Sequence, residues 1–372
     1  MNILMSYMAN QKRNKFNKKH LNNFSLAFEL AKINLGSTKE NPSVGCVVEK
    51  NGSIISSGYT SIDGRPHAEY NALKKNLNYK DSNIYITLEP CSHYGKTPPC
   101  TNIIQKRGIK KVFFAINDFD ERSKNKSTKI LLKKKILTYK LYPKERGIRF
   151  YESYGRLKKK SLPLIDAKIA LSNDYYTCNR KKKWITNNKS RNLAHLLRTK
   201  YHVLISTSQS INNDNSLLNC RIEGLTNKSP DLVILDRNLS IKKNLSIFKM
   251  KNTRKILIYT STYNKKKIKW LKNRKIKVIL MKEMNSREDY IKLFKSLIKM
   301  NYSRVLVESG LTFTNFLIKK RLIDNIYIFK TINNLNNNGF NNSSSNLLKK
   351  IKLKNKLKVN LDKDKVYFER LK

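Results

Sequence analysis

The residues with the clearest chemical use are one histidine, one glutamate and two cysteines near the start of the chain. His67 and Glu69 stand two positions apart in His-Ala-Glu, and Cys91 and Cys100 each follow a proline. One imidazole and two thiolates can supply three zinc ligands and leave a fourth position open for water. The pattern therefore predicts a catalytic zinc site, with His67, Cys91 and Cys100 as ligands and Glu69 free to move protons.

This set of residues suits the hydrolytic deamination of a cytosine-type or adenine-type ring. The reaction adds hydroxide to a ring carbon and expels ammonia, and bound zinc can lower the pKa of water from about 15.7 to about 7. Glu69 would accept the proton of the water and later protonate the leaving amine. Both cysteines must bind as thiolates, which a metal and a helix N-terminus favour, and Pro90 and Pro99 suit helix starts.

Two other interpretations of these residues stay open. In the first, His67 is a hydrogen-bonded histidine and the cysteines are small buried residues, although four polar groups beside two Pro-Cys steps favour a metal site. In the second, the zinc is structural and has four protein ligands, with Cys46 or His93 as the fourth. Replacement of Glu69 separates these cases, because only a catalytic site has turnover to lose.

The cysteine spacing and three sequence blocks carry a family resemblance. Eight residues separate Cys91 from Cys100, whereas nucleoside and transfer-RNA deaminases usually have Pro-Cys-x-x-Cys. Residues 41–48 (NPSVGCVV), 64–69 (GRPHAE) and 87–100 (TLEPCSHYGKTPPC) resemble, in order and spacing, the family of bifunctional riboflavin-biosynthesis deaminase/reductases. The resemblance is closest over residues 22–120 and continues more thinly through the rest of the chain.

The resemblance implies a fold, two activities and two cofactors. The fold is α/β, with an N-terminal cytidine-deaminase-like αβα domain followed by a dihydrofolate-reductase-like α/β domain. The first domain would deaminate 2,5-diamino-6-(5-phosphoribosylamino)pyrimidin-4-one with one Zn²⁺ per chain. The second would use NADPH to reduce the ribosyl group to ribityl. Asn41 matches the position that hydrogen-bonds the pyrimidine, although a turn residue before Pro42 is the alternative.

In the second half the resemblance is carried by short pieces in the family's order. The positions that match substrate-binding residues are Lys182, Arg198, Asp214, Leu218, Arg221 and Glu308. The positions that match cofactor-binding residues are Ala170, Trp184, Ser210, Asp214, Gly310, Leu311, Thr312, Phe313 and Thr314. Each residue alone could be a core or surface residue, but their common order favours a reductase.

The chain also departs from the family pattern. Tyr175 stands where the family has glycine, Lys182 where it has serine, and residues 118–127 (DFDERSKNKS) lack the glycines of the family's loop. A deaminase with a degenerate reductase domain is therefore an alternative. An assay of NADPH oxidation with the deaminated intermediate separates the two functions.

The formal net charge is +52 over 372 residues. Such a charge fits nucleic-acid binding, phosphorylated substrates with NADPH, or compositional drift toward lysine and asparagine. We favour drift and expect no specific nucleic-acid partner, because the lysines are spread over both halves, although the surface would attract polyanions. The long Cys91–Cys100 loop also argues against the remaining alternative, an RNA or nucleoside deaminase.

The cysteine count and the hydrophobic pattern indicate a cytoplasmic protein. Five cysteines are not a typical disulfide framework, and thiolate ligands suit a reducing compartment. No stretch resembles a signal peptide or approaches the roughly 18–20 apolar residues of a membrane helix. We therefore expect small phosphoribosylated pyrimidines as partners and no membrane. Members of the family often form dimers or larger assemblies, so a homo-oligomer stays open.

The elements that must position these residues follow from hydrophobic periodicity and turn signals. In the first half we predict helices at 23–35, 67–77 and 100–107 and strands at 45–49, 54–58, 83–88 and 111–116, the αββαβαβ order of a cytidine deaminase. The second half alternates strands with helices, which favours a parallel-rich sheet, and it lacks Gly-x-Gly-x-x-Gly. The predicted division is a disordered basic extension at 1–21, a deaminase domain at 22–145, a linker at 146–163 and a reductase domain at 164–372.

Overall fold

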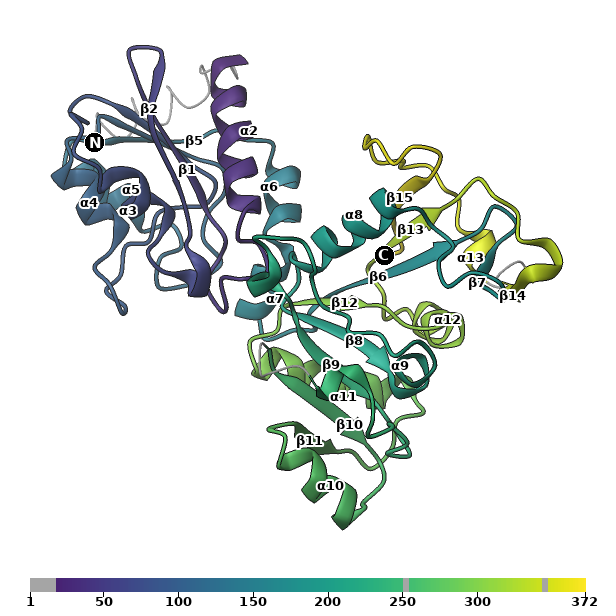
Figure 1. The fold of residues 1–372 in the computed structure, drawn as a ribbon. Coiled ribbons are helices and arrows are strands. Elements are labelled where there is room, and N and C mark those ends of the chain that lie inside the picture. Colours follow the sequence, from purple (N-terminus) through teal and green to yellow (C-terminus); the bar gives the residue numbers. More distant parts are fainter. Residues whose placement is uncertain (1–17, 250–253, 343–346) are drawn as a thin grey trace. The chain divides into compact units, whose positions relative to one another are not determined.

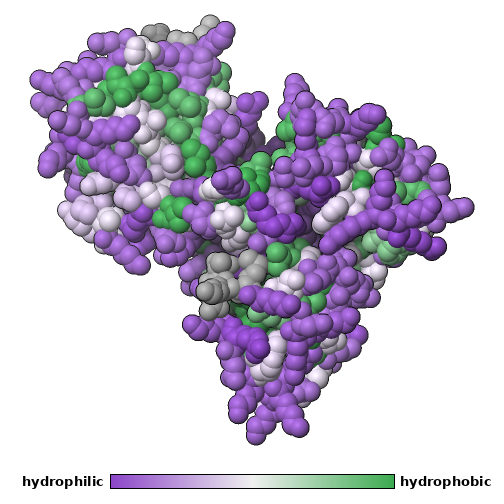
Figure 2. All heavy atoms as spheres, viewed as in Figure 1, coloured by the Kyte–Doolittle hydropathy of each residue, from purple (hydrophilic) through white to green (hydrophobic). Residues whose placement is uncertain are grey.

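The computed structural model describes residues 18–249, 254–342 and 347–372, which fold into two units (Figure 1). The first unit ends at Lys159 and the second begins at Lys160. The visible face of each unit carries mostly hydrophilic side chains, as the excess of lysine requires (Figure 2). Within the described ranges, no helix combines the length and the apolar character that a membrane crossing needs.

The first unit is built on a sheet of five strands in the order β2-β1-β3-β4-β5. Strand β1 runs antiparallel to β2 and β3, whereas β3, β4 and β5 are parallel. The strands are β1 (Gly45–Lys50), β2 (Ser53–Tyr59), β3 (Asn83–Ile86), β4 (Lys111–Phe114) and β5 (Leu137–Lys140). The helices are α2 (Lys18–Lys32), α3 (Ala68–Leu73), α4 (Cys100–Lys106), α5 (Ser127–Lys133), α6 (Lys144–Phe150) and α7 (Glu152–Lys158).

Two glycines allow helices to approach both faces of this sheet. An added Cβ on Gly45 would lie 1.8 Å from the backbone oxygen of Ala27 in α2, and one on Gly58 would lie 2.4 Å from that of Ala68 in α3. Gly58 pairs with Cys46, the neighbour of Gly45, and successive residues of a strand face opposite sides. Helices α2 and α3 therefore cover opposite faces, which gives the predicted αβα layers.

The beginning of the first unit differs from the predicted disordered extension at 1–21. Residues 1–17 lie outside the described part, but α2 already starts at Lys18. Lys19 Nζ lies 3.0 Å from Glu49 Oε1, and the His20 ring centroid lies 4.7 Å from that of Phe113. These contacts with the sheet hold the first helical turn, although its sequence is basic and carries no apolar period.

The end of the first unit differs from the predicted linker at 146–163, because α6 and α7 extend to Lys158. Tyr151, between them, is 2% exposed and belongs to the hydrophobic core of the unit. Its hydroxyl donates to the carbonyl oxygen of Ser43 at 3.1 Å and lies 2.6 Å from Thr87 Oγ1. The basic composition of the segment hides these buried contacts from a sequence analysis.

The second unit contains a sheet of eight strands in the order β11-β10-β9-β8-β12-β6-β13-β15. Its strands are parallel except for β15, which pairs antiparallel with β13 at one edge. They are β6 (Leu164–Leu171), β8 (Val203–Thr207), β9 (Asp231–Leu235), β10 (Ile256–Thr260), β11 (Lys277–Leu280), β12 (Arg304–Val307), β13 (Asn325–Lys330) and β15 (Lys365–Arg370). This sheet confirms the predicted parallel-rich architecture.

The helices of the second unit connect these strands. They are α8 (Asn188–Arg198), α9 (Ser208–Asp214), α10 (Lys265–Lys272), α11 (Arg287–Lys299), α12 (Leu311–Lys319) and α13 (Leu347–Lys350). The start of α11 shows how the sequence fixes a boundary, because Ser286 and Asp289 form a reciprocal capping box. Short 3₁₀ turns lie at Ile62–Gly64, Thr226–Lys228, Ser246–Phe248 and Asn336–Asn338.

A small second sheet lies in a segment whose composition favours a loop. Residues 333–346 are rich in asparagine and serine, which is typical of a loose loop, but β14 (Gly339–Asn342) pairs antiparallel with β7 (Tyr176–Asn179). Residues 343–346 lie outside the described part. The pairing partner is about 160 residues away in the chain, so local composition carries no signal for it.

Candidate active sites

The predicted zinc ligands come from two helix starts and one loop of the first unit. His67 is the N-cap residue of α3, and Cys100, preceded by Pro99, is the first residue of α4. Cys91 lies in the loop that follows β3. A helix start presents backbone N–H groups and a partial positive charge, which stabilise a nearby thiolate. Both Pro-Cys steps therefore bring a cysteine sulfur to the same end of the sheet.

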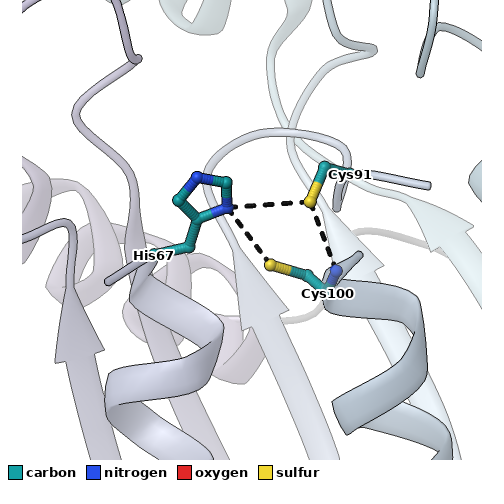
Figure 3. A group of neighbouring side chains, drawn as sticks. All are labelled: His67, Cys91 and Cys100. Atoms are coloured by element: carbon teal, nitrogen blue, oxygen red, sulfur yellow. Dashed lines mark hydrogen bonds between the residues drawn. The ribbon is translucent and has the colours of Figure 1, made fainter. Parts of the chain in front are cut away.

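The three side chains converge (Figure 3). His67 Nδ1 lies 3.6 Å from Cys91 Sγ and 3.4 Å from Cys100 Sγ, and the backbone N–H of Cys100 donates to Cys91 Sγ at 3.2 Å. The ligand atoms all lie within 4.8 Å of one another. A ring nitrogen and two sulfurs at this separation fit a tetrahedral Zn²⁺ with one further position open.

The electrostatics of the cluster favour a metal-binding thiolate and a proton-carrying carboxyl group. A hydrogen bond from the Cys100 thiol lowers the pKa of Cys91, and the nearby His67 adds to this effect. Glu69 is only 4% exposed. Burial and the negative charge of Cys91 raise the pKa of Glu69 to about 7, so this carboxyl group can exchange protons near neutral pH.

Neither candidate for a fourth protein ligand joins the cluster. Among the described residues, the group that could hold a metal consists of His67, Cys91 and Cys100. Cys46 is buried in the core around β1, and the Nδ1 atom of His93 is 2.8 Å from Ser123 Oγ. The arrangement therefore fits a catalytic zinc site rather than a structural one with four protein ligands.

The predicted pyrimidine-binding residue Asn41 lies in the loop between α2 and β1. Its backbone is fixed by Thr38, whose hydroxyl donates to the Asn41 carbonyl oxygen at 2.8 Å. Its amide lies against Gly64, where an added Cβ would be 2.4 Å from Asn41 Nδ2. The structure thus sets Asn41 beside the block that contains His67.

In the second unit, two predicted substrate residues form a buried ion pair. The Arg198 guanidinium donates from Nε to Glu308 Oε1 at 2.7 Å and from Nη2 to Glu308 Oε2 at 2.9 Å. Each residue is 9% exposed. Lys168 Nζ lies 3.8 Å from Glu308 Oε2. Burial would raise the pKa of Glu308, but the charges of Arg198 and Lys168 outweigh it and lower this pKa to about 2.

Asn219 links the Arg198–Glu308 pair to Arg221, another predicted substrate residue. The carbonyl oxygen of Asn219 accepts Arg198 Nη1 at 2.8 Å, and its side-chain oxygen accepts Arg221 Nη1 at 3.4 Å. His195 Nδ1 also lies 2.9 Å from that carbonyl oxygen. Arg221 itself is exposed.

Two of the predicted cofactor residues, Ser210 and Gly310, lie where β8 and β12 end side by side. Ser210 Oγ accepts the backbone N–H of Gly310 at 3.0 Å and lies 3.3 Å from Ser309 Oγ. Gly310 is the exposed N-cap residue of α12 and carries no side-chain cap. Small residues beside an open helix start fit a phosphate group of NADPH.

The residues after Gly310 divide between the surface and the core. Thr312 is exposed, whereas Leu311 and Thr314 are buried within α12. The Thr314 hydroxyl donates to the Gly310 carbonyl oxygen at 3.2 Å. The Phe313 ring packs against Tyr290, with 5.6 Å between centroids. Leu311, Phe313 and Thr314 therefore hold the helix in place.

The other predicted residues of the second unit are more scattered. Trp184 is 50% exposed, with the Arg191 guanidinium 5.2 Å from its ring centroid, so it is not a core residue. Leu218 is buried, with φ of 52°. Ala170 lies in β6 opposite Phe329. Lys182 and Asp214 are exposed, and no hydrogen bond between either and the Arg198–Glu308 pair occurs among the described contacts.

Comparison with known proteins assigns both units. Residues 17–116 match the cytidine and deoxycytidylate deaminase zinc-binding region, and residues 163–331 match the RibD C-terminal domain. The riboflavin biosynthesis protein RibD of Aquifex aeolicus is 33% identical over 312 residues, which cover 83% of this chain and 85% of that protein. The chain belongs to the RibD family. The RibD of Buchnera aphidicola is 31% identical over 319 residues, which cover 82% of this chain and 84% of that protein.

Solved structures of RibD agree with this assignment. The RibD of Acinetobacter baumannii superposes with a TM-score of 0.79 at 26% identity, over 94% of this chain and 98% of that one. A Thermotoga maritima protein, described as a diaminohydroxyphosphoribosylaminopyrimidine deaminase/5-amino-6-(5-phosphoribosylamino)uracil reductase, gives 0.79 at 25% identity, over 95% and 98%. The predicted family, fold class, bifunctional deaminase and reductase activity, and the use of zinc and NADPH are confirmed.

Two residues that contact the Arg198–Glu308 pair, Lys168 and Asn219, were not among the predicted site residues. Lys168 shares one face of β6 with Ala170, and the register Val307↔Ala167 brings it beside Glu308. A charged residue inside an apolar strand is the signal that could have found it. Asn219 contributes mainly its backbone carbonyl oxygen. Every residue has this group, so the residue type gives no sign of the role in a sequence.

Proposed function

We propose that the first unit converts 2,5-diamino-6-(5-phosphoribosylamino)pyrimidin-4-one into the corresponding uracil and ammonia, and that the second reduces the ribosyl group of this product to ribityl. The description of the Thermotoga maritima relative supports these substrates. The observation that carries the deaminase half is the convergence of His67, Cys91 and Cys100 beside buried Glu69.

In the first unit, His67, Cys91 and Cys100 would hold one Zn²⁺. Zinc in such a site makes water a nucleophile near neutral pH. Glu69 would take one proton from this water and pass it to a ring nitrogen, and it would then carry the proton of the added hydroxyl group to the departing amine. Burial raises the pKa of its carboxyl group, which favours a group that both accepts and donates protons. Asn41, held beside Gly64, would orient the pyrimidine through its amide.

In the second unit, Gly310 and Ser210 would bind a phosphate of NADPH, whose hydride reduces the sugar. Ala170, Trp184 and Leu311–Thr314 would complete the cofactor site, with Thr312 as its exposed member.

The substrate of the second unit would meet residues around the buried ion pair. Glu308 would contact the sugar, and Arg198 would hold Glu308 through its two hydrogen bonds. Arg221 is exposed and would meet the substrate phosphate. Asp214, at the end of α9, would provide polar control at the sugar, while Lys182 and Leu218 would border the substrate.

The cysteines bear on the compartment, and the family resemblance bears on the assembly. All five cysteines are free thiols, which supports a reducing cytoplasm. A homo-oligomer stays a prediction from the family, and light scattering of the full chain tests it.

The function is tested by metal analysis and separate assays of the two steps on the full chain. We expect about one zinc per chain, ammonia release from the pyrimidine, and NADPH oxidation with the deaminated intermediate. A strong chelator should abolish the first rate and leave the second within about twofold, because the two sites use different residues. Absence of NADPH oxidation would instead favour a degenerate reductase domain.

A further inference from the structure

Glu89, two residues before Cys91, carries a buried carboxylate that the proposed mechanism does not use. It is 2% exposed. Its backbone N–H donates to the Ile116 carbonyl oxygen at 2.9 Å, which places its side chain beside the loop that follows β4. Burying a charged group is costly unless hydrogen bonds compensate it, so its partners show what the carboxylate holds.

Among the described residues, the hydrogen-bond partners of the Glu89 side chain belong to residues 117–127. Oε2 accepts hydrogen bonds from Asn117 Nδ2 at 3.2 Å, from the Asp118 N–H at 3.1 Å and from the Asn125 N–H at 3.0 Å. Oε1 accepts the Ser127 N–H at 3.3 Å and the Ser127 hydroxyl at 2.8 Å. Each of these five groups is a donor. Only a carboxylate offers acceptors at both oxygens.

The same loop also forms hydrogen bonds with the residues that directly follow Cys91 in the chain. Ser123 is fully buried, and its Oγ accepts the Ser92 N–H at 3.3 Å and lies 2.8 Å from His93 Nδ1. Glu89 and Ser92 flank the Pro90-Cys91 step. The backbone that carries Cys91 is therefore attached to residues 117–127 at both ends.

This loop is the part of the first unit that lacks the glycines of the family pattern. Asn125 stands there with φ of 59°, a left-handed conformation that asparagine tolerates better than most residues. Its N–H is one of the donors to Glu89. The carboxylate thus stabilises a backbone turn that glycine would otherwise make easily.

We propose that Glu89 is a positioning residue of the metal centre, which fixes Cys91 by anchoring residues 117–127 on both sides of the Pro90-Cys91 step. Groups that orient metal ligands typically change metal affinity 10–100-fold when they are replaced. This inference rests on the proposed zinc site, because Cys91 matters only as its ligand.

The test compares Glu89→Gln with Ser127→Ala and with the control Glu121→Gln in the full chain. Gln places an N–H₂ group against donors, whereas Ser127→Ala keeps the carboxylate and removes its shortest hydrogen bond. Glu121 lies in the same loop, but its described partner is Lys124 and its side chain is 79% exposed. Three quantities are measured: the zinc dissociation constant, the absorption of the Co²⁺-substituted protein, and hydrogen exchange of the Asn125 and Ser127 amides. NADPH oxidation serves as an internal reference for the second unit, and the exchange of amides in β1 and β3 serves as the reference for the fold of the first.

For Glu89→Gln we expect a zinc dissociation constant about 10–100-fold higher, a changed thiolate-to-cobalt charge-transfer band, faster exchange of both amides, and unchanged NADPH oxidation. Ser127→Ala should show the same changes with smaller magnitude. If Glu89→Gln fails to fold, the result for Ser127→Ala tests the inference instead. Glu121→Gln should match the wild type. A zinc affinity within twofold of wild type, or a lower affinity with an unchanged cobalt band, would overturn the inference. Absence of zinc binding by the wild type would instead refute the proposed function.

Discussion

At the scale of single residues, the proposed zinc site separates its three ligands from the carboxyl group that would move protons. His67, Cys91 and Cys100 are held by two helix starts and a loop, whereas Glu69 is buried in the first turn of α3. The carboxyl group is therefore fixed beside the ligands without being one of them, and its removal should leave the metal in place.

Replacement of Glu69 by Gln tests this division. We expect deamination to fall by about 10²–10⁴-fold, the range of general acid–base catalysis, with zinc content unchanged and NADPH oxidation within twofold. Ammonia release and metal analysis on the same preparation measure both effects. Loss of zinc together with activity would assign Glu69 to the metal-binding set instead.

The ion pair of Glu308 gives the second unit a pH-dependent stability. The pKa of Glu308 is lowered from 4.5 to about 2 in the folded chain, so the unfolded chain binds a proton more readily. The stabilisation is then complete above about pH 4.5 and is lost as the pH falls toward about 2.

We expect the unfolding free energy of the second unit to decrease by an order of 3 kcal/mol across this window because of Glu308. Urea denaturation at several pH values measures it through tryptophan fluorescence, since both tryptophans, Trp184 and Trp270, lie in this unit. Glu308→Gln should be less stable at neutral pH, because Arg198 is left unpaired. The variant should also lose this part of the pH dependence. An equal pH dependence in both proteins would contradict the assignment.

At the scale of elements, the two short helices α6 and α7 complete the core of the first unit. Tyr151 fills this core and bonds the backbone beside β1, and Tyr154 bonds Asp118 Oδ1 at 3.1 Å. The segment predicted as a linker thus contributes buried contacts to the core of the first unit.

Tyr151→Ala should lower the unfolding free energy of the first unit by about 3–5 kcal/mol, the cost of removing a buried aromatic ring. Arg149→Ala, an exposed position in α6, is the matched control and should change stability by less than about 0.5 kcal/mol. Hydrogen exchange of peptides from β1 and β3 reports on this unit alone. Equal stability of the two variants would restore the linker interpretation.

At the scale of the whole molecule, two chemistries lie on two units that carry a formal net charge of +52. The residues proposed for each site lie within a single unit. The lysines occur throughout the sequences of both units, and the visible faces in Figure 2 are mostly hydrophilic.

Compositional drift predicts polyanion binding without specificity. Transfer RNA should bind the full chain at 50 mM salt and lose affinity by about 10³-fold or more at 200 mM, because the binding comes from released counterions. Unrelated RNA of the same length should compete equally. Binding that resists salt and prefers one sequence, measured by fluorescence anisotropy, would indicate a nucleic-acid partner.

Much of the first unit could be predicted because its signals are local. The helices that begin near His67 and Cys100 follow from Pro-Cys and His-Ala-Glu steps, and these two predicted ligands lie at the starts of those helices. The second unit was less predictable at its site. Lys182 and Asp214 are exposed, and the family resemblance did not indicate that Arg198 and Glu308 would bind each other.

The sequence by itself determined the family, the order of the elements and the donor set of the metal site, because residue types and short spacings encode them. Tertiary structure alone decided which groups meet across long separations. Arg198 and Glu308 are 110 residues apart, Tyr151 reaches Ser43 across 108, and Glu89 reaches Ser127 across 38. These contacts depend on how strands are registered and helices packed, and no local pattern of residues specifies that.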